Sequence, residues 1–308
     1  MVIPLTIMVC LVATAALVVI QHGGKRPSVF FGIDVPSADP ALVDAAAVDS
    51  GASPTVQNIF VKLDSRSFTV DTLKKMSDRR LTPMVSLEPW SVASTWTGGG
   101  MPEYRLDQLS AGRYDAQLTG IARTVATFGK PVYLRFAHEM NGDWYPWAEG
   151  VNGNKPGDYV KAWRHVHDLI KAISPQAKLL WSPNAGTGLA GLAELFPGDR
   201  YVDAVGMTAY GHGASAADTL ADTYHALLSL SKRPVILSEV GADGPEKASW
   251  IRSFGRFVAT ASRVVGFVWF NTSPETTKAT GDYRFNDSPD STAAFAAMLA
   301  KQRLAAPR

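Results

Sequence analysis

The chain has 308 residues, of which 46% are hydrophobic and 19% charged, so its composition suits a folded protein with a sizeable core and excludes a disordered one. A net charge of +2, without any block of basic residues, argues against a nucleic-acid-binding protein. The single cysteine, Cys10, excludes an internal disulfide and any metal site built from several cysteines.

Residues 1–20 are apolar and carry no charge, and about 20 such residues can span a bilayer. We expect an export signal or an uncleaved membrane anchor here, and therefore a secreted or cell-surface protein. Lys25 and Arg26 follow the segment and argue weakly against export by the positive-inside rule, so a helix packed on the folded domain is the alternative. Residues 1–26 then form the signal or anchor with its linker, and residues 27–308 form the catalytic domain.

Eight apolar runs of strand length follow, rich in β-branched and aromatic residues. Most are continuous rather than alternating, which is typical of parallel strands that are buried on both faces. The expected strands are residues 29–35, 58–64, 83–89, 132–139, 178–184, 202–210, 235–242 and 264–271.

Helical patterns separate most of these strands, at residues 112–129, 158–173, 216–231, 245–261 and 291–305. Ser215 with Asp218 fits a helix-capping pattern, and Pro245 fits a first-turn position. The links after the first, second and fifth strands are shorter or weaker. This alternation predicts an α/β protein with a single closed (β/α)8 barrel. An open doubly wound sheet is the alternative, but no glycine-rich phosphate loop follows the first strand.

In a (β/α)8 barrel the active site lies at the carboxyl ends of the strands. Here those ends carry carboxylates, aromatic rings and histidines, namely Glu88, Trp90, His138, Glu139, Asn141, Tyr210, His212, Glu239 and Trp269. Glu88 and Trp90 are expected either to line a subsite or to shape a loop. Arg135 shares the strand parity of Glu139 and is expected to point into the barrel, where it either neutralises a carboxylate or serves the reaction.

The sharpest feature is the pair of glutamates at the ends of the fourth and seventh strands, Glu139 and Glu239. Two carboxylates about 5 Å apart can cleave a glycosidic bond with retention, one as acid/base and the other as nucleophile. Either glutamate alone fits a salt-bridged rim residue. Both together, with aromatic rings at neighbouring strand ends, predict a polysaccharide hydrolase that uses no metal and no organic cofactor.

The stretch RFAHEMNGDWYPW (135–147), with SEVG (238–241) and WFN (269–271) downstream, resembles glycoside hydrolase family 26, a family of retaining (β/α)8 glycosidases. The resemblance implies that Glu139 is the acid/base and Glu239 the nucleophile. It also implies that His138 contacts the sugar or the nucleophile near the bond that is cleaved.

The same resemblance assigns roles around the pair. Trp144 would shape the leaving-group side, Tyr210 would hydrogen-bond the nucleophile, and Trp269 would be the platform under the sugar whose bond breaks. Asn141 lies in the same motif and is expected to bind substrate.

The family implies endo-acting hydrolysis of β-linked polysaccharides: β-1,4-mannan most often, and also β-1,3-xylan or mixed-linkage β-glucan. A secreted mannanase and a surface enzyme that trims the organism's own polysaccharide both remain open. A transglycosylase would share all these residues, and a non-catalytic sugar-binding protein is the rival from another class. We expect a monomer whose partner is a polysaccharide and not a nucleic acid.

Overall fold

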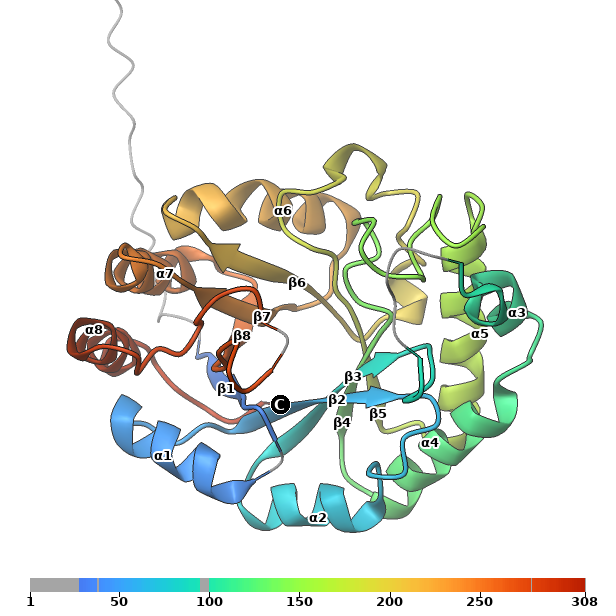
Figure 1. Ribbon diagram of the computed structural model, residues 1–308, viewed down its shortest axis with the longest axis horizontal. Helices are drawn as coiled ribbons and strands as arrows, with labels where there is room; N and C mark the ends of the chain where they lie inside the picture. The colour runs from blue at the N-terminus through green and yellow to red at the C-terminus, as the bar shows by residue number, and fades with distance from the viewer. Residues whose placement is uncertain (1–27, 38, 95–99, 278, 308) are drawn as a thin grey trace, which may run out of the picture.

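Eight parallel strands close into one barrel in the order of the chain, β1 to β8 (Figure 1). The structure is a computed structural model that describes residues 28–307, apart from residues 38, 95–99 and 278. The strands are Phe30–Asp34 (β1), Val56–Lys62 (β2), Thr82–Glu88 (β3), Val132–Phe136 (β4), Ala177–Trp181 (β5), Ala204–Gly211 (β6), Val235–Ala242 (β7) and Val264–Phe270 (β8). The predicted (β/α)8 barrel is confirmed, with all eight strands near their expected positions.

Helices surround the barrel in the view down its axis (Figure 1). They are Pro40–Ser50 (α1), Val70–Asp78 (α2), Leu106–Ser110 (α3), Asp115–Phe128 (α4), Asp158–Ile173 (α5), Ala216–Leu230 (α6), Lys247–Thr260 (α7) and Pro289–Ala300 (α8). The weak link after β5 holds only the short 3-10 helices Leu189–Gly191 (η2) and Asp199–Tyr201 (η3), and Pro102–Tyr104 (η1) precedes α3.

Helix ends follow the capping chemistry of the sequence at α6 but not at α7. Ser215 caps α6 and forms the expected reciprocal capping box with Asp218. Helix α7 begins at Lys247, with Glu246 as its N-cap, so Pro245 lies before the helix and not in its first turn as predicted.

The barrel interior has an apolar layer and a polar layer. The apolar layer takes one side chain from each strand: Phe30, Val56, Met84, Tyr133, Leu180, Ala204, Ile236 and Val268. Beyond it, towards the carboxyl ends of the strands, the buried side chains are polar and include Asp34, Asn58, Ser86, Arg135, Thr208 and Ser238. The larger apolar core lies between the strands and the helices. The interior of the barrel is therefore polar towards the carboxyl ends of the strands, where the active site of such barrels lies.

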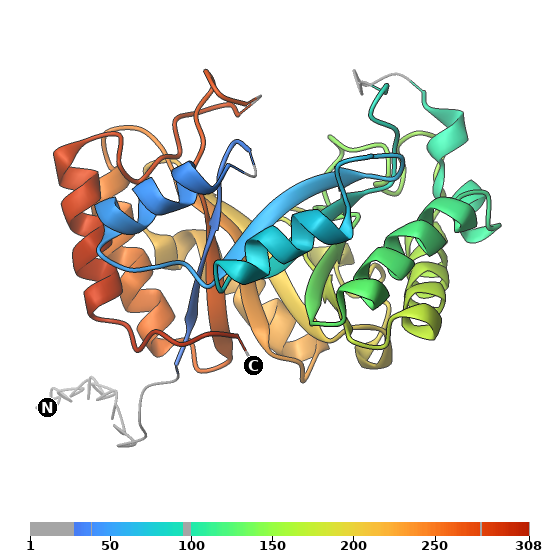
Figure 2. The ribbon, with the colours of Figure 1, turned by 90° about the horizontal axis from the view of Figure 1, so that it is seen from below.

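The C-terminal segment returns to the start of the barrel (Figure 2), where Val29 and Leu304 form an isolated parallel bridge. The predicted export signal or anchor, residues 1–20, lies outside the described residues. Among the helices of the described part of the chain, none combines the length and apolar character needed to cross a bilayer.

Candidate active site

Glu139 is placed by a backbone turn and not by a strand. Strand β4 ends at Phe136, three residues earlier than the sequence predicts. Ala137 and Glu139 have positive φ angles of 43° and 56°, and the Glu139 amide donates to the Ser182 carbonyl at 2.8 Å. Left-handed backbone is uncommon for residues other than glycine and is concentrated at functional sites. The turn holds the Glu139 side chain over the barrel mouth.

Glu239 is placed by a β-bulge in β7. Gly206 and Thr208 of β6 pair with Ile236 and Glu239, so β7 carries one extra residue over this interval. The pairing of β7 with β8 shifts over the same residues, between Leu237 and Val240. A bulge adds a residue, bends the strand and re-aims side chains, often beside an active site. The bulge accounts for the presence of Ser238 and Glu239 together on the inner side.

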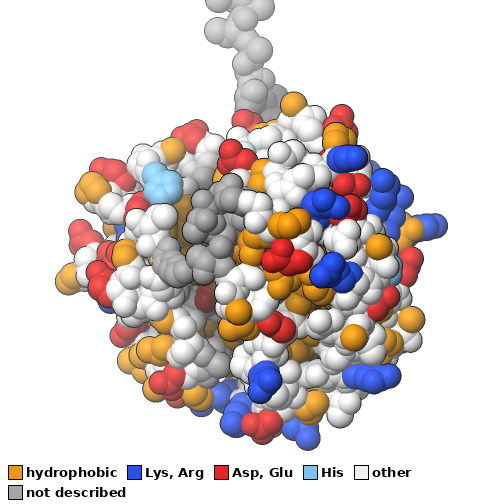
Figure 3. Space-filling view, turned by 45° about the vertical axis from the view of Figure 1, so that its right-hand side comes forward, with side chains coloured by type: hydrophobic (Ala, Val, Ile, Leu, Met, Phe, Trp, Pro, Cys, Tyr) orange, Lys and Arg blue, Asp and Glu red, His pale blue; other side chains and the backbone are white. Residues whose placement is uncertain are grey.

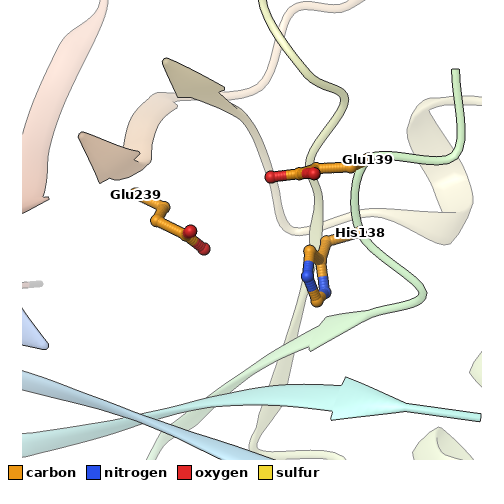
Figure 4. A group of neighbouring side chains, drawn as sticks. All are labelled: His138, Glu139 and Glu239. Atoms are coloured by element: carbon orange, nitrogen blue, oxygen red, sulfur yellow. The ribbon is translucent and has the colours of Figure 1, made fainter. Parts of the chain in front are cut away.

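The two carboxyl groups face each other across the mouth, with the His138 ring beside them (Figure 4). One oxygen of Glu139, one oxygen of Glu239 and one ring nitrogen of His138 lie within 4.8 Å of one another. This closest approach favours the carboxyl spacing of retaining glycosidases, about 5–5.5 Å, over the wider spacing of about 6.5–9.5 Å that an inverting mechanism needs.

Glu239 has a hydrogen-bond donor at each oxygen. The Arg135 guanidinium donates to Oε2 at 2.5 Å, and the Tyr210 hydroxyl donates to Oε1. Arg135 is fully buried and is held by the hydroxyls of Ser86 and Ser182 at 3.0 Å and 3.1 Å. Such donors stabilise an ionised carboxylate. Arg135 therefore points into the barrel as expected, where it forms an ion pair with Glu239 and is absent from the cleft lining.

Glu139 has the opposite electrostatic environment. Burial and the nearby charge of Glu239 raise the pKa of Glu139 to about 7. The indole N–H of Trp144 donates to its Oε2 at 2.6 Å and opposes this rise. A carboxylic acid that keeps its proton close to neutral pH is what acid catalysis requires.

His138 is a neutral imidazole in an aromatic setting. It is buried, and burial lowers the pKa of His138 well below its usual value. Its ring lies edge-on to Phe60 and Tyr145. Within the described part of the chain, its Nδ1 has no hydrogen-bond partner. A ring nitrogen of His138 lies within 4.8 Å of an oxygen of each carboxyl group.

A cleft of about 710 Å³ opens over the carboxyl pair. Its aromatic lining is Phe60, Trp144, Tyr145, Tyr210, Phe270 and Tyr283, and its hydroxyl-bearing lining includes Ser37, Thr72, Thr272 and Thr280. Rings that offer apolar faces, interspersed with hydroxyl groups, suit a sugar chain. On the face seen in Figure 3, acidic and basic side chains are interspersed, without a large area of one sign.

Trp269 does not occupy the predicted platform position. Its side chain is fully buried in the layer between barrel and helices, where it packs on Phe254 and Phe295. Side chains alternate across a strand, so the next residue, Phe270, faces the cleft instead. The Trp269 indole donates to the Tyr283 carbonyl at 2.9 Å and thereby supports the loop that lines the cleft.

Asn141 connects two loops and does not line the cleft. Its amide donates to the Asn184 carbonyl at 2.9 Å and to the Thr187 carbonyl, and its oxygen accepts from the Asn184 amide at 2.7 Å. The side chain is thus committed to backbone groups, which argues against the predicted substrate contact.

Glu88 and Trp90 shape the wall and are absent from the cleft lining. The Trp90 indole donates to Glu88 Oε2 at 2.9 Å, and its ring packs edge-on against Trp147 and Tyr145. Of the two roles that the sequence left open, the structure favours support of a loop. Tyr145 stacks on Trp147 and presents its other side to the cleft.

Sequence reasoning assigned no site role to Asp34, Tyr145, Phe270 or Tyr283, all of which line the cleft. The rule that used strand ends would have found Asp34, because this residue ends β1. Strand parity would have preferred Phe270 to Trp269, since Val268 already belongs to the inward-facing set.

The two glutamates and His138 also carry atoms that can coordinate a metal ion. Among the described residues, His138, Glu139 and Glu239 are a group whose ligand atoms lie close enough to share one ion. Glu239, however, already pairs with a buried cation, the Arg135 guanidinium. The donor set therefore fits an acid and nucleophile pair better than a metal centre.

Comparison with known proteins gives the family. The family model for glycosyl hydrolase family 26 matches residues 75–257. Endoglucanase H of Acetivibrio thermocellus is 32% identical over 231 residues, which cover 69% of this chain and 23% of that protein. Mannan endo-1,4-beta-mannosidase A and B of Caldalkalibacillus mannanilyticus is 27% identical over 193 residues, or 59% of this chain and 34% of that protein. The chain thus spans about a quarter to a third of the length of these two relatives.

Solved structures agree on the fold. A family 26 β-mannanase from Bacteroides ovatus superposes with a TM-score of 0.70 at 17% identity, covering 91% of this chain and 90% of that one. A modular endo-β-1,4-mannanase from Cellulomonas fimi gives a TM-score of 0.69 at 18% identity, covering 90% of this chain and 72% of that one. Because the family model matches more than half of the chain, this protein belongs to glycosyl hydrolase family 26.

Proposed function

We propose that the protein is a retaining endo-β-glycosidase that hydrolyses a β-linked polysaccharide by double displacement. The carrying observation is the pair of carboxyl oxygens within 4.8 Å of each other, one on Glu139 with a pKa of about 7 and one on Glu239, which is ion-paired with Arg135. A retaining mechanism needs one carboxyl group that is protonated, as the acid, and one that is ionised, as the nucleophile.

In the first step, Glu239 attacks the anomeric carbon while the glycosidic bond breaks. Glu139 gives its proton to the departing oxygen, and the leaving group is released as an alcohol. The sugar is now joined to Glu239 as an ester. Tyr210 and Arg135 hold the attacking carboxylate in place through its two oxygens.

In the second step, Glu139 acts as a base. It takes a proton from water, the water oxygen bonds to the anomeric carbon, and the ester bond to Glu239 breaks. Both glutamates return to their starting states, and the product keeps the original anomeric configuration. A sugar hydroxyl in place of water would give transglycosylation.

For the substrate we propose β-1,4-mannan or a related β-glycan. The names of relatives support this class and leave the sugar open: an endoglucanase, several mannan endo-1,4-β-mannosidases and two β-1,3-xylanases. Apolar residues 1–20 favour a secreted or anchored enzyme at the cell surface, where trimming or transglycosylation of the organism's own exopolysaccharide is the second candidate. Non-catalytic glycan binding is a weaker candidate, because it needs no close carboxyl pair.

The test is the release of reducing ends from β-1,4-mannan, β-1,3-xylan and mixed-linkage β-glucan. We expect the wild type to cleave at least one polymer and the Glu239→Ala variant to cleave none. The matched control is Glu103→Ala, which removes an exposed glutamate and should retain full activity. A folded wild type that binds these sugars without cutting them would contradict hydrolysis and favour the binding role.

A further inference from the structure

Asp34 is a buried carboxyl group at the cleft that the mechanism above does not use. It ends β1, is 3% exposed and lines the cleft. A buried carboxyl group is costly to keep without a partner or a function. The burial of Asp34 at the cleft therefore points to a partner or a function for its carboxyl group.

One oxygen of Asp34 is fixed by a chain of hydrogen bonds that also reaches the nucleophile. The Asn58 amide donates to Asp34 Oδ2 at 2.6 Å. The Ser86 hydroxyl donates to the Asn58 oxygen at 3.0 Å, and Arg135 donates to the Ser86 hydroxyl at 3.0 Å. Because Arg135 also binds Glu239, the same network orients Asp34 and the proposed nucleophile.

The other oxygen of Asp34 remains available. No described residue donates a hydrogen bond to Oδ1, and the residue borders the cleft. Burial, together with the charge of Glu239, raises the pKa of Asp34 well above its usual value. A protonated carboxyl group whose first oxygen is held by an amide presents an O–H to the cleft, as a donor for a ligand oxygen.

Asp34 lies on the same side of the cleft as Glu239. In the barrel order, β1 is two strands from β7, which carries Glu239, with only β8 between them (Figure 1). Asp34 pairs in register with Phe270 of β8, another cleft residue. Glu139 and its partner Trp144 follow β4, on the opposite part of the ring. A group at Asp34 thus meets the sugar that is transferred and not the leaving group.

We propose that Asp34 is a substrate-binding residue that donates a hydrogen bond to a hydroxyl group of the sugar unit that becomes attached to Glu239. This inference rests on the proposed function. It adds a recognition contact at the end of β1, outside the acid, the nucleophile and their direct partners.

Two variants test it, Asp34→Ala and Asp34→Asn, compared by kcat/KM on whichever of the three polymers the wild type cleaves. The alanine removes the contact, and we expect a loss of about 10- to 100-fold. The asparagine keeps an acceptor for Asn58 and presents an N–H to the cleft, so it should remain within about threefold of wild type. Thermal unfolding of both variants shows whether a loss of activity comes from a loss of folding.

The outcomes separate this inference from the proposed function. Wild-type cleavage with an Asp34→Ala rate within about threefold of wild type overturns the contact and leaves the enzyme assignment intact. Equal losses in both variants, with unchanged unfolding, overturn the donor role. If the wild type cleaves no polymer, thermal protection by oligosaccharides cut from the same polymers replaces the rate. Protection that is lost in alanine and kept in asparagine supports the contact, and no protection of the wild type overturns both proposals.

Discussion

We expect Trp144 to set the alkaline limit of activity through one hydrogen bond, and Trp144→Phe removes that bond while keeping an aromatic ring. The indole N–H donates to Glu139 Oε2 at 2.6 Å. A hydrogen bond to the carboxylate favours its charged form, so its removal raises the pKa of Glu139 above about 7.

The size of the shift follows from the bond and its surroundings. Hydrogen bonds to charged groups contribute about 1.5–3 kcal/mol, and about 1.4 kcal/mol corresponds to one pH unit. Trp144 is 39% exposed, so water replaces part of the lost bond and the lower end applies. We expect a shift of about one unit.

The assay is kcat/KM against pH on the polymer that the wild type cleaves best. Glu139 must be protonated to act as acid, so wild-type activity should fall as pH rises through about 7, and the variant should hold its activity to about pH 8. The acid limb does not involve Trp144 and serves as the internal control. An alkaline limb that stays in place or moves to lower pH would refute the assignment of Glu139 or of its bond.

Three further substitutions address the remaining groups. Glu139→Ala should lower turnover of polymers by about 10²–10⁴-fold but spare aryl glycosides with good leaving groups, which need no protonation; equal losses on both would contradict the acid role. Tyr210→Phe should reduce kcat by about tenfold or more while KM changes little, as steady-state kinetics will show. Arg135→Met leaves Glu239 buried without its cation, so denaturant unfolding should reveal a loss of about 3–5 kcal/mol, largely relieved in the double variant with Glu239→Gln.

The fold could be predicted because its signal is repeated. Eight apolar runs, most of them buried on both faces, occur at spacings that leave room for a helix or loop, and a closed parallel barrel satisfies all of them at once. Of the three links that looked shorter or weaker in the sequence, those after β1 and β2 contain α-helices, and the one after β5 contains only 3-10 helices. Local sequence patterns were sufficient to predict the structure of a segment wherever the environment of its residues depended on that segment alone.

The types of residue in the site could be predicted, but the orientations of their side chains could be predicted less well. The bulge that places Glu239 depends on the pairing of β7 with both neighbours, and the left-handed turn that places Glu139 depends on a bond to the Ser182 carbonyl. Neither leaves a local signature in the sequence. Trp269 was misassigned for a different reason, because its platform role was carried over from the family resemblance without counting strand parity.

The charges of the site explain how one carboxyl group serves in both steps of the proposed mechanism. Glu139 and Glu239 lie together with one buried cation, Arg135, so only one negative charge is neutralised, and Glu139 keeps its proton partly because Glu239 is charged. When Glu239 becomes an ester, that repulsion is lost while Arg135 remains. The pKa of Glu139 must then fall, since the cation now acts on it without the opposing charge. In the proposed mechanism the acid of the first step thereby becomes the base of the second.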